Sequence, residues 1–183
     1  MRYPALIMVV LLFSCKGKIK TEEEPKIDET VYEMWGDFTA SYPEFKNNAM
    51  PESWYFHDNE KDANRLANLT VNGKKTATTS GLYSWYVDAD TDLPKIGVKH
   101  IITDFKGKAQ AIIEIIQVDT IPFNQLSDEF AAKDMGTSRE PLKKWKKAHW
   151  DFFTSVMQEN DGEPSQEMLI VFEQFRKIWP QGK

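Results

Sequence analysis

Apolar side chains recur every three or four residues along several stretches of this chain, which is the spacing of one face of an α-helix. From Asp28 the pattern predicts a first helix, in which Val31, Trp35 and Phe38 share a face and whose extent is limited by Pro43. Three further helices are predicted at residues 58–71, 127–135 and 138–158. Polar residues cap the starts of the first two of these, with Asp58 or Asn59 for one and Ser127 or Asp128 for the other.

Between these helices lie short runs rich in β-branched residues, which predict strands. Residues 75–80 form the first run. Residues 98–105 and 109–120 flank Lys106-Gly107-Lys108 and predict a hairpin, and residues 168–179 form a final strand. Because helices and strands mix in this order without a repeated βαβ unit, we expect an α+β fold. Its sheet is small, curved or barrel-like, with helices on the outside.

The composition fits one domain with a substantial core. The chain has 183 residues, 13% of them aromatic, with six tryptophans. Its net charge of −5 argues against broad nucleic-acid binding through a basic surface, although a local basic patch is compatible with it. Residues 15–27 are charged and nearly free of large apolar groups, so we expect a flexible tether there. A helical extension at residues 28–53 and a domain at residues 54–179 follow.

The single cysteine comes directly after an apolar run at the start of the chain. Residues 5–13 are uncharged, Arg2 precedes them, and the small residue Ser14 stands before Cys15. This arrangement resembles a bacterial lipoprotein signal peptide at residues 1–14. The resemblance implies cleavage before Cys15, acyl chains such as palmitate on that residue, and an exported protein anchored to the cell envelope. Once Cys15 is acylated no other cysteine remains, so we expect no disulfide, no cysteine-based zinc site and no cysteine nucleophile.

An ordered set of short segments resembles a known family. Gly73-Lys74-Lys75-Thr76-Ala77-Thr78 follows the second helix, and the set continues at residues 93–97, 101–104, 112–114, 122–123, 129–131, 145–153 and 171–175. In this order the segments resemble the ASCH domain of the PUA-like superfamily. The resemblance implies a β-barrel with flanking helices and a cleft beside the Gly-Lys-Lys-Thr segment, which takes RNA or modified nucleosides. Some members are similar to amidohydrolases that deacylate N4-acylated cytidine, and another type is a ribonuclease.

The amidohydrolase type implies a catalytic pair at Lys75 and Thr78, and Asp134 falls where that type carries a glutamate. A lysine whose pKa is lowered by burial can take the proton of a threonine hydroxyl, and a carboxylate can orient the lysine. Residues three apart on a strand face opposite sides, so this pair converges only across a bulge or bend. Without one, Lys74, Thr76 and Thr78 share a face, and a solvated strand explains the segment equally well.

A binding cleft is the other interpretation of the same segment. Lys74, Lys75 and Thr76 would suit a polar or anionic ligand, and Trp85 is available to stack on a base or to join the core. Glu114 lies within the long predicted strand, either in the cleft or on the polar face of that strand.

His149 shares the apolar face of the helix at residues 138–158, and we interpret it as a hydrogen-bonded core histidine. No histidine or carboxylate pair has the spacing of a metal site on a helix, and no cofactor is expected. Three functions remain open. They are binding of a nucleoside, nucleotide or RNA fragment, amidohydrolysis of an acylated cytidine, and an envelope scaffold that recruits a protein partner through the first helix.

Overall fold

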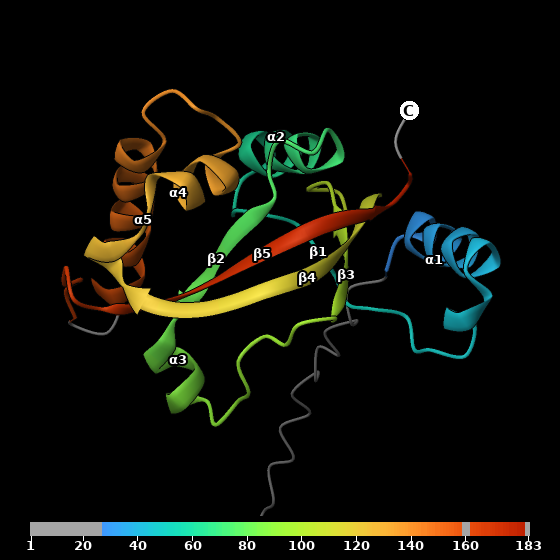
Figure 1. The fold of residues 1–183 in the computed structure, drawn as a ribbon, viewed down its shortest axis with the longest axis horizontal. Helices are drawn as coiled ribbons and strands as arrows, with labels where there is room; N and C mark the ends of the chain where they lie inside the picture. The colour runs from blue at the N-terminus through green and yellow to red at the C-terminus, as the bar shows by residue number, and fades with distance from the viewer. Residues whose placement is uncertain (1–26, 159–161, 182–183) are drawn as a thin grey trace, which may run out of the picture.

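A five-stranded mixed sheet forms the centre of the computed structural model, which describes residues 27–158 and 162–181 (Figure 1). The signal peptide, Cys15 and nearly all of the tether lie outside these residues. The strand order is β1-β3-β4-β5-β2, with β1 parallel to β3 and the other pairs antiparallel. The strands are β1 (Ser53–Trp54), β2 (Ala77–Leu82), β3 (Lys99–Thr103), β4 (Ala109–Pro122) and β5 (Leu169–Trp179).

The sheet confirms the α+β prediction, including the hairpin between β3 and β4 and the final strand. Along the described strands, β1 and β2 form the two edges, so the sheet is open and is not closed into a barrel. The four-residue stretch from Lys75 to Thr78 begins as a loop, because β2 starts at Ala77 instead of Lys75.

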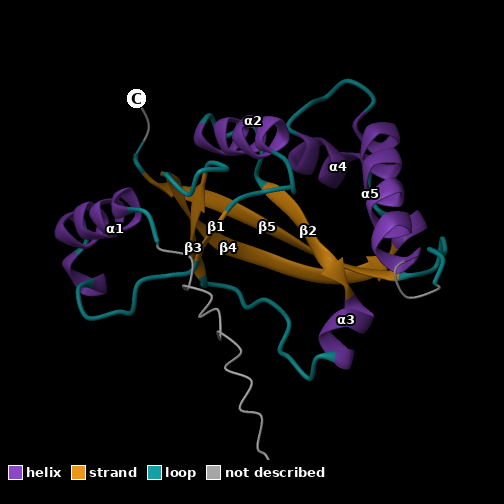
Figure 2. Ribbon diagram, turned by 180° about the vertical axis from the view of Figure 1, so that it is seen from behind, coloured by secondary structure: helices purple, strands orange, loops and turns teal. Residues whose placement is uncertain are grey.

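Helices surround the sheet, and Figure 2 shows α1 at the opposite end from α4 and α5. The predicted caps Asn59 and Ser127 are confirmed, and the structure adds a third cap at Asp28. Asp28, Asn59 and Ser127 accept the backbone N–H of Thr30, Asp62 and Phe130 at 3.0, 2.9 and 3.1 Å. The helices are α1 (Glu29–Ser41), α2 (Glu60–Val71), α3 (Tyr83–Asp88), α4 (Asp128–Met135) and α5 (Pro141–Gln158), with 3₁₀ turns at Pro43–Phe45 and Phe123–Gln125.

Both faces of the β3–β4 hairpin are buried, which explains its continuous apolar sequence. Side chains alternate along a strand, so Ile101 and Ile112 pack under α1 while Ile102 and Ile113 pack in the cluster beneath α2. The helix α1 contributes Val31 to the first of these clusters. The hydroxyl of Thr30 also accepts the N–H of Ala109 at 2.9 Å, so the extension is joined to the sheet.

A third cluster lies at the far end, where α4 and α5 cover β2 and β5. Trp145, Phe123 and Phe153 are almost fully buried there. Helix α3 was not predicted from the sequence. It follows β2 directly and spans six residues, too few to establish a helical repeat of apolar positions. These helices and the exposed edge of β2 enclose the candidate site.

Candidate functional site

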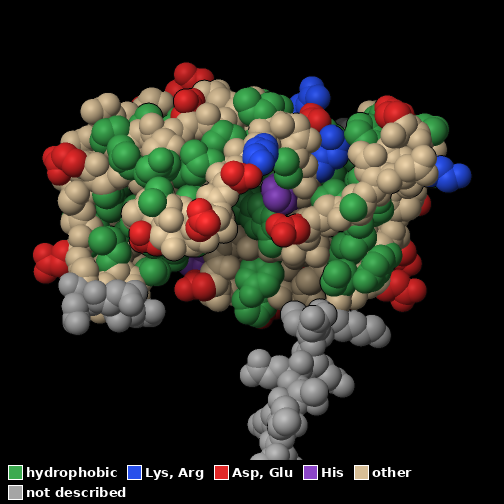
Figure 3. All heavy atoms as spheres, turned by 90° about the horizontal axis from the view of Figure 1, so that it is seen from below, with side chains coloured by type: hydrophobic (Ala, Val, Ile, Leu, Met, Phe, Trp, Pro, Cys, Tyr) green, Lys and Arg blue, Asp and Glu red, His purple; other side chains and the backbone are tan. Residues whose placement is uncertain are grey.

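A cleft runs along β2 and has two neighbouring lobes. The helix lobe, of about 560 Å³, lies between β2 and helices α2, α4 and α5, and it contains Lys75, Asp134 and His149. The loop lobe, of about 620 Å³, lies between β2, β1 and the loop at residues 92–95, and it contains Glu173. Phe56, His57 and residues 78–80 line both lobes, so they form one continuous site. Figure 3 shows a hollow on the lower face with hydrophobic side chains inside it and acidic side chains at its edge.

The loop after α2 carries Lys75 into the floor of the helix lobe. Gly73 adopts a φ of +67°, and the N–H groups of Lys74 and Lys75 both donate to the Leu69 carbonyl, which ends the helix and turns the chain inward. The Lys75 ammonium donates to the carbonyl oxygens of Ala77 and Asp134 at 2.8 and 2.9 Å, and to the Asp134 carboxylate. Only 2% of the Lys75 side chain is exposed, so this is a buried ion pair.

The Asp134 carboxylate collects donors from three other elements. Trp145 Nε1 donates at 2.9 Å, the Thr79 hydroxyl donates at 3.1 Å, and Lys75 forms the ion pair. Burial alone would raise the pKa of Asp134, but Lys75, His149 and Trp145 outweigh it and lower the pKa. The carboxylate therefore remains ionised, and its position is fixed by bonds to β2, α5 and the loop before β2.

Burial lowers the pKa of the Lys75 ammonium, and the charge of Asp134 offsets only part of that effect. An ammonium has three N–H donors and no lone pair. In its charged form Lys75 therefore uses its full donor capacity on Ala77 and Asp134 and is not free to accept a proton.

His149 lies above Asp134 and is confirmed as hydrogen-bonded. Its ring stacks on Trp145 with centroids 4.2 Å apart, and its Nδ1 lies 3.0 Å from the Trp145 carbonyl oxygen. A carbonyl only accepts, so we assign the proton to Nδ1. Burial lowers the pKa of His149, which leaves a neutral ring with Nε2 unprotonated and 3.7 Å from Asp134 Oδ2.

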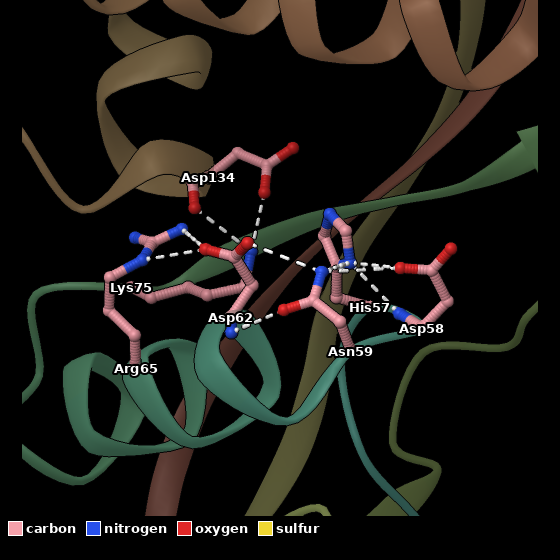
Figure 4. A network of polar contacts seen from close by, with 7 residues as sticks. All are labelled: His57, Asp58, Asn59, Asp62, Arg65, Lys75 and Asp134. Atoms are coloured by element: carbon pink, nitrogen blue, oxygen red, sulfur yellow. Dashed lines mark hydrogen bonds and ion pairs between the residues drawn. The ribbon is translucent and has the colours of Figure 1, made fainter.

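The mouth of the helix lobe is formed by the start of α2 (Figure 4). Asp62 accepts two hydrogen bonds from Arg65 at 2.9 and 3.1 Å, and Asn59 links the helix start to His57. His57 has a φ of +66°, a strained conformation for a residue that is not glycine. Strain of this kind is typical of functional sites because the surrounding structure has to hold it in place.

The structure brings together some of the residues that the sequence singled out. Lys75, Thr78, Asp134 and Trp85 all line the helix lobe. The hydroxyl that reaches Asp134 belongs to Thr79, because neighbouring residues on a strand face opposite sides and Thr79 is the one that faces Asp134.

The other candidates lie elsewhere. Lys74 is exposed, and neither it nor Thr76 lines either lobe. Glu114 lies in a separate cavity of about 590 Å³ beside α1, where it pairs with Lys99 at 3.0 Å and accepts from Arg176 Nε at 2.8 Å. The pairing of β3 with β4 places Glu114 opposite Lys99, away from the cleft.

Sequence reasoning did not find the roles of Thr79, Trp145 and Glu173. Trp145 lies on the apolar face of its helix, and nothing in that apolar pattern shows that its indole N–H donates to a carboxylate. Glu173 lies within a hydrophobic strand, and a single acid inside such a strand is a signal that could have marked it as a candidate site residue.

Within the described residues, no three His, Cys, Asp or Glu side chains are grouped to hold a metal ion. In the same part of the chain, no helix combines the length and apolar character needed to cross a membrane.

Comparisons with known proteins agree with this architecture. A family model described as the ASCH domain matches residues 52–179. The crystal structure of an ASCH domain from Lactobacillus crispatus JV V101 is 29% identical, with a TM-score of 0.74 over 84% of this chain and 96% of that chain. The crystal structure of a protein from Enterococcus faecalis V583 is 31% identical, with a TM-score of 0.71 over 81% of this chain and 88% of that chain. A search of curated proteins found no match.

Proposed function

The chain belongs to the ASCH domain family, a PUA-like fold associated with RNA binding, and on that premise we propose that its cleft binds a nucleoside or a short nucleotide fragment of RNA. The observation that carries this proposal is the combination of polar and aromatic walls in the helix lobe. Residues 78–80 supply hydroxyl groups on one side, and Trp85 and Phe152 supply aromatic surface on another. A nucleobase needs both, because its faces stack and its edges form hydrogen bonds.

The charges around the cleft favour a small ligand over a long RNA. Asp58 and Asp62 stand at the mouth of the helix lobe with Arg65 as the counter-charge, and Asp92 and Lys95 pair at the mouth of the loop lobe. A long RNA brings many phosphates, and its affinity depends on an excess of Lys and Arg. A volume of about 560 Å³ lies in the range of small-molecule sites.

Calorimetric titration of the full chain with nucleosides, nucleoside monophosphates and short RNA oligomers tests this proposal. Trp85→Leu should weaken nucleoside binding roughly 5- to 150-fold, the cost of one lost base stack. Lys74→Met is the control and should bind like the unmodified chain, since Lys74 lies outside both lobes. Failure of every one of these ligands to bind would contradict the proposal.

A second candidate is amidohydrolysis of N4-acylated cytidine-like nucleosides, favoured by the placement of Lys75, Thr78 and Asp134 along one lobe. The Thr78 oxygen would attack the acyl carbonyl while its proton moves to a neutral Lys75 amine. The amide C–N bond would then break as Lys75 returns that proton to N4 of the departing cytidine. Water would hydrolyse the acyl-threonine, which releases the carboxylic acid and restores the Thr78 hydroxyl. The burial that lowers the pKa of Lys75 favours the neutral amine that this step needs.

Chromatography of N4-acetylcytidine incubated with the protein tests this second candidate. Thr78→Ala should abolish turnover, whereas Thr79→Ala should retain it with some loss of stability, because Thr79 is bonded to Asp134. Turnover that survives Thr78→Ala would contradict the assignment of the nucleophile.

We also propose that Cys15 is lipidated and holds the protein at the bacterial cell envelope. The support is the sequence of residues 1–15, which resembles a lipoprotein signal. Cys15→Ala should stop palmitate labelling and release the protein from membranes. Labelling that persists in this variant would contradict the proposal.

A further inference from the structure

Glu173 is a buried carboxylate at the floor of the loop lobe. It lies on β5, between β4 and β2, opposite Val118 on one side and Thr78 on the other. Only 6% of the residue is exposed, and it lines the loop lobe. A charged group in such a position is costly unless a partner satisfies it.

The described residues offer that carboxylate few ion-pair or hydrogen-bond partners. Within residues 27–158 and 162–181, no Lys, Arg or His forms an ion pair with Glu173, and burial raises its pKa. The nearby Ser80 hydroxyl has one proton, and the Val171 carbonyl oxygen competes for it at 3.3 Å. Among the described residues, His100 Nδ1 is the one fully buried side-chain nitrogen or oxygen that lacks a hydrogen-bond partner. A Glu173 oxygen without a partner is therefore not fully buried, and it is accessible from the lobe.

Aromatic side chains line the same lobe as this carboxylate. Trp54 and Phe56 meet edge to face with centroids 4.9 Å apart, and His100 meets Trp54 at 5.7 Å. Together with Tyr86 they line the loop lobe. A planar heterocycle therefore finds surfaces to stack on and an acceptor at the floor.

We propose that Glu173 selects guanine by accepting hydrogen bonds from the edge of the base. This inference rests on the proposed nucleoside-binding function. Two hydrogen-bond donors from a ligand favour the ionised form of this carboxylate, whose two oxygens only accept hydrogen bonds. Among the common bases, guanine alone presents two adjacent donors, N1–H and the 2-amino group, which match the two oxygens.

The other bases place an acceptor against the carboxylate. The donor edges of adenine and cytosine have a ring nitrogen acceptor beside the amino group, and the single uracil N–H lies between two carbonyl oxygens. The only described lysine in this lobe, Lys95, pairs with Asp92 at 2.6 Å at the exposed mouth. Among the described residues that line this lobe, no lysine or arginine is therefore left unpaired to reverse this preference.

The test is calorimetric titration of the full chain with guanosine, inosine, adenosine, cytidine and uridine. The unmodified protein should prefer guanosine to the last three by roughly 5- to 150-fold, the discrimination of a good bidentate contact. Inosine, which lacks the 2-amino group, should bind at least roughly 10-fold more weakly than guanosine, because one hydrogen bond to a charged carboxylate is lost.

Glu173→Gln should remove most of the guanosine preference, and Glu167→Gln, the same change at an exposed acid outside both lobes, should retain it as the matched control. Circular dichroism checks that each variant is folded, and the inosine comparison needs no variant at all. Equal affinity for all the nucleosides, or a guanosine preference that survives in folded Glu173→Gln, would overturn this inference and leave the proposed function standing. Binding of none of them would overturn both.

Discussion

Two groups of ion-paired side chains lie at opposite ends of this molecule, and they differ in how far they are buried. The Lys75–Asp134 pair lies inside the cleft, with 2% and 6% of its side chains exposed. The Glu114 cluster, made of Lys99, Glu114 and Arg176, lies beside α1, and 66% of the Arg176 side chain is exposed. The charges are the same in kind, but water screens only the second cluster.

The comparison shows that the role of an ion pair depends on its surroundings more than on its distances. Two charges buried together depend on each other, since either one alone would be an unpaired charge in the interior. The members of a partly exposed cluster can turn to water when a partner is lost. We therefore expect the cleft to be sensitive to substitution and to pH near neutrality, and the Glu114 cluster to be tolerant of both.

The largest expected effect comes from Lys75→Met. This change leaves the Asp134 carboxylate buried without its cation, so the free energy of unfolding should fall by about 3–5 kcal/mol in urea denaturation. Lys74→Met, at the exposed neighbouring position, should change it little. An equal loss of stability in both variants would show that burial of the Lys75–Asp134 pair does not make it more sensitive to substitution than an exposed lysine.

The next effect is a loss of stability in mild acid. Burial lowers the pKa of folded His149 from its usual 6.5, so the unfolded chain takes up this proton first as the pH falls. Stability should therefore decline below about pH 6.5, by about 1–2 kcal/mol between pH 7 and pH 5. His149→Gln should reduce this slope without abolishing it, because burial also lowers the pKa of His100. An unchanged slope in the variant would count against the assignment.

The Glu114 cluster should give a smaller effect. Burial alone would raise the pKa of Glu114, but hydrogen bonds from Lys99 and Arg176 outweigh it and lower the pKa, so its contribution is lost only below pH 4.5. Glu114→Gln should cost about 1 kcal/mol at neutral pH, and less in 1 M salt, where charges are screened. A cost as large as that of Lys75→Met would remove the distinction between the two clusters.

The smallest expected effect belongs to a fully exposed ion pair, with which the two clusters can be compared. Lys147 and Asp151 pair at 2.7 Å on the surface of α5, with 78% and 62% of their side chains exposed. Lys147→Met should leave the thermal unfolding midpoint unchanged within error. A clear shift would show that exposed pairs in this protein stabilise it more than pairs of this kind usually do.

Local signals in the sequence were sufficient to predict most of the helices and strands. The caps at Asn59 and Ser127 and the hairpin turn depend on side chains that act within a few residues, so their positions could be predicted. Helix α3 was missed because it is too short for periodicity to reveal it.

The site was harder to predict because its contacts join residues far apart in the chain. The bond from Thr79 to Asp134 depends on where β2 begins, because that decides the side each threonine faces, and no sequence pattern marks this start. Glu114 and Glu173 are both acids within strands, and only the order of the strands places one beside α1 and the other in the cleft.

That strand order also has a consequence for synthesis. Although β5 is the last of the described strands to be translated, it lies between β4 and β2, and in the described sheet only β5 joins these two strands. A nascent chain that stops before Leu169 has neither Glu173 nor the strand that holds β2 beside the cleft. Ligand binding should therefore appear only after translation of β5, which makes it a test of whether the sheet has been assembled.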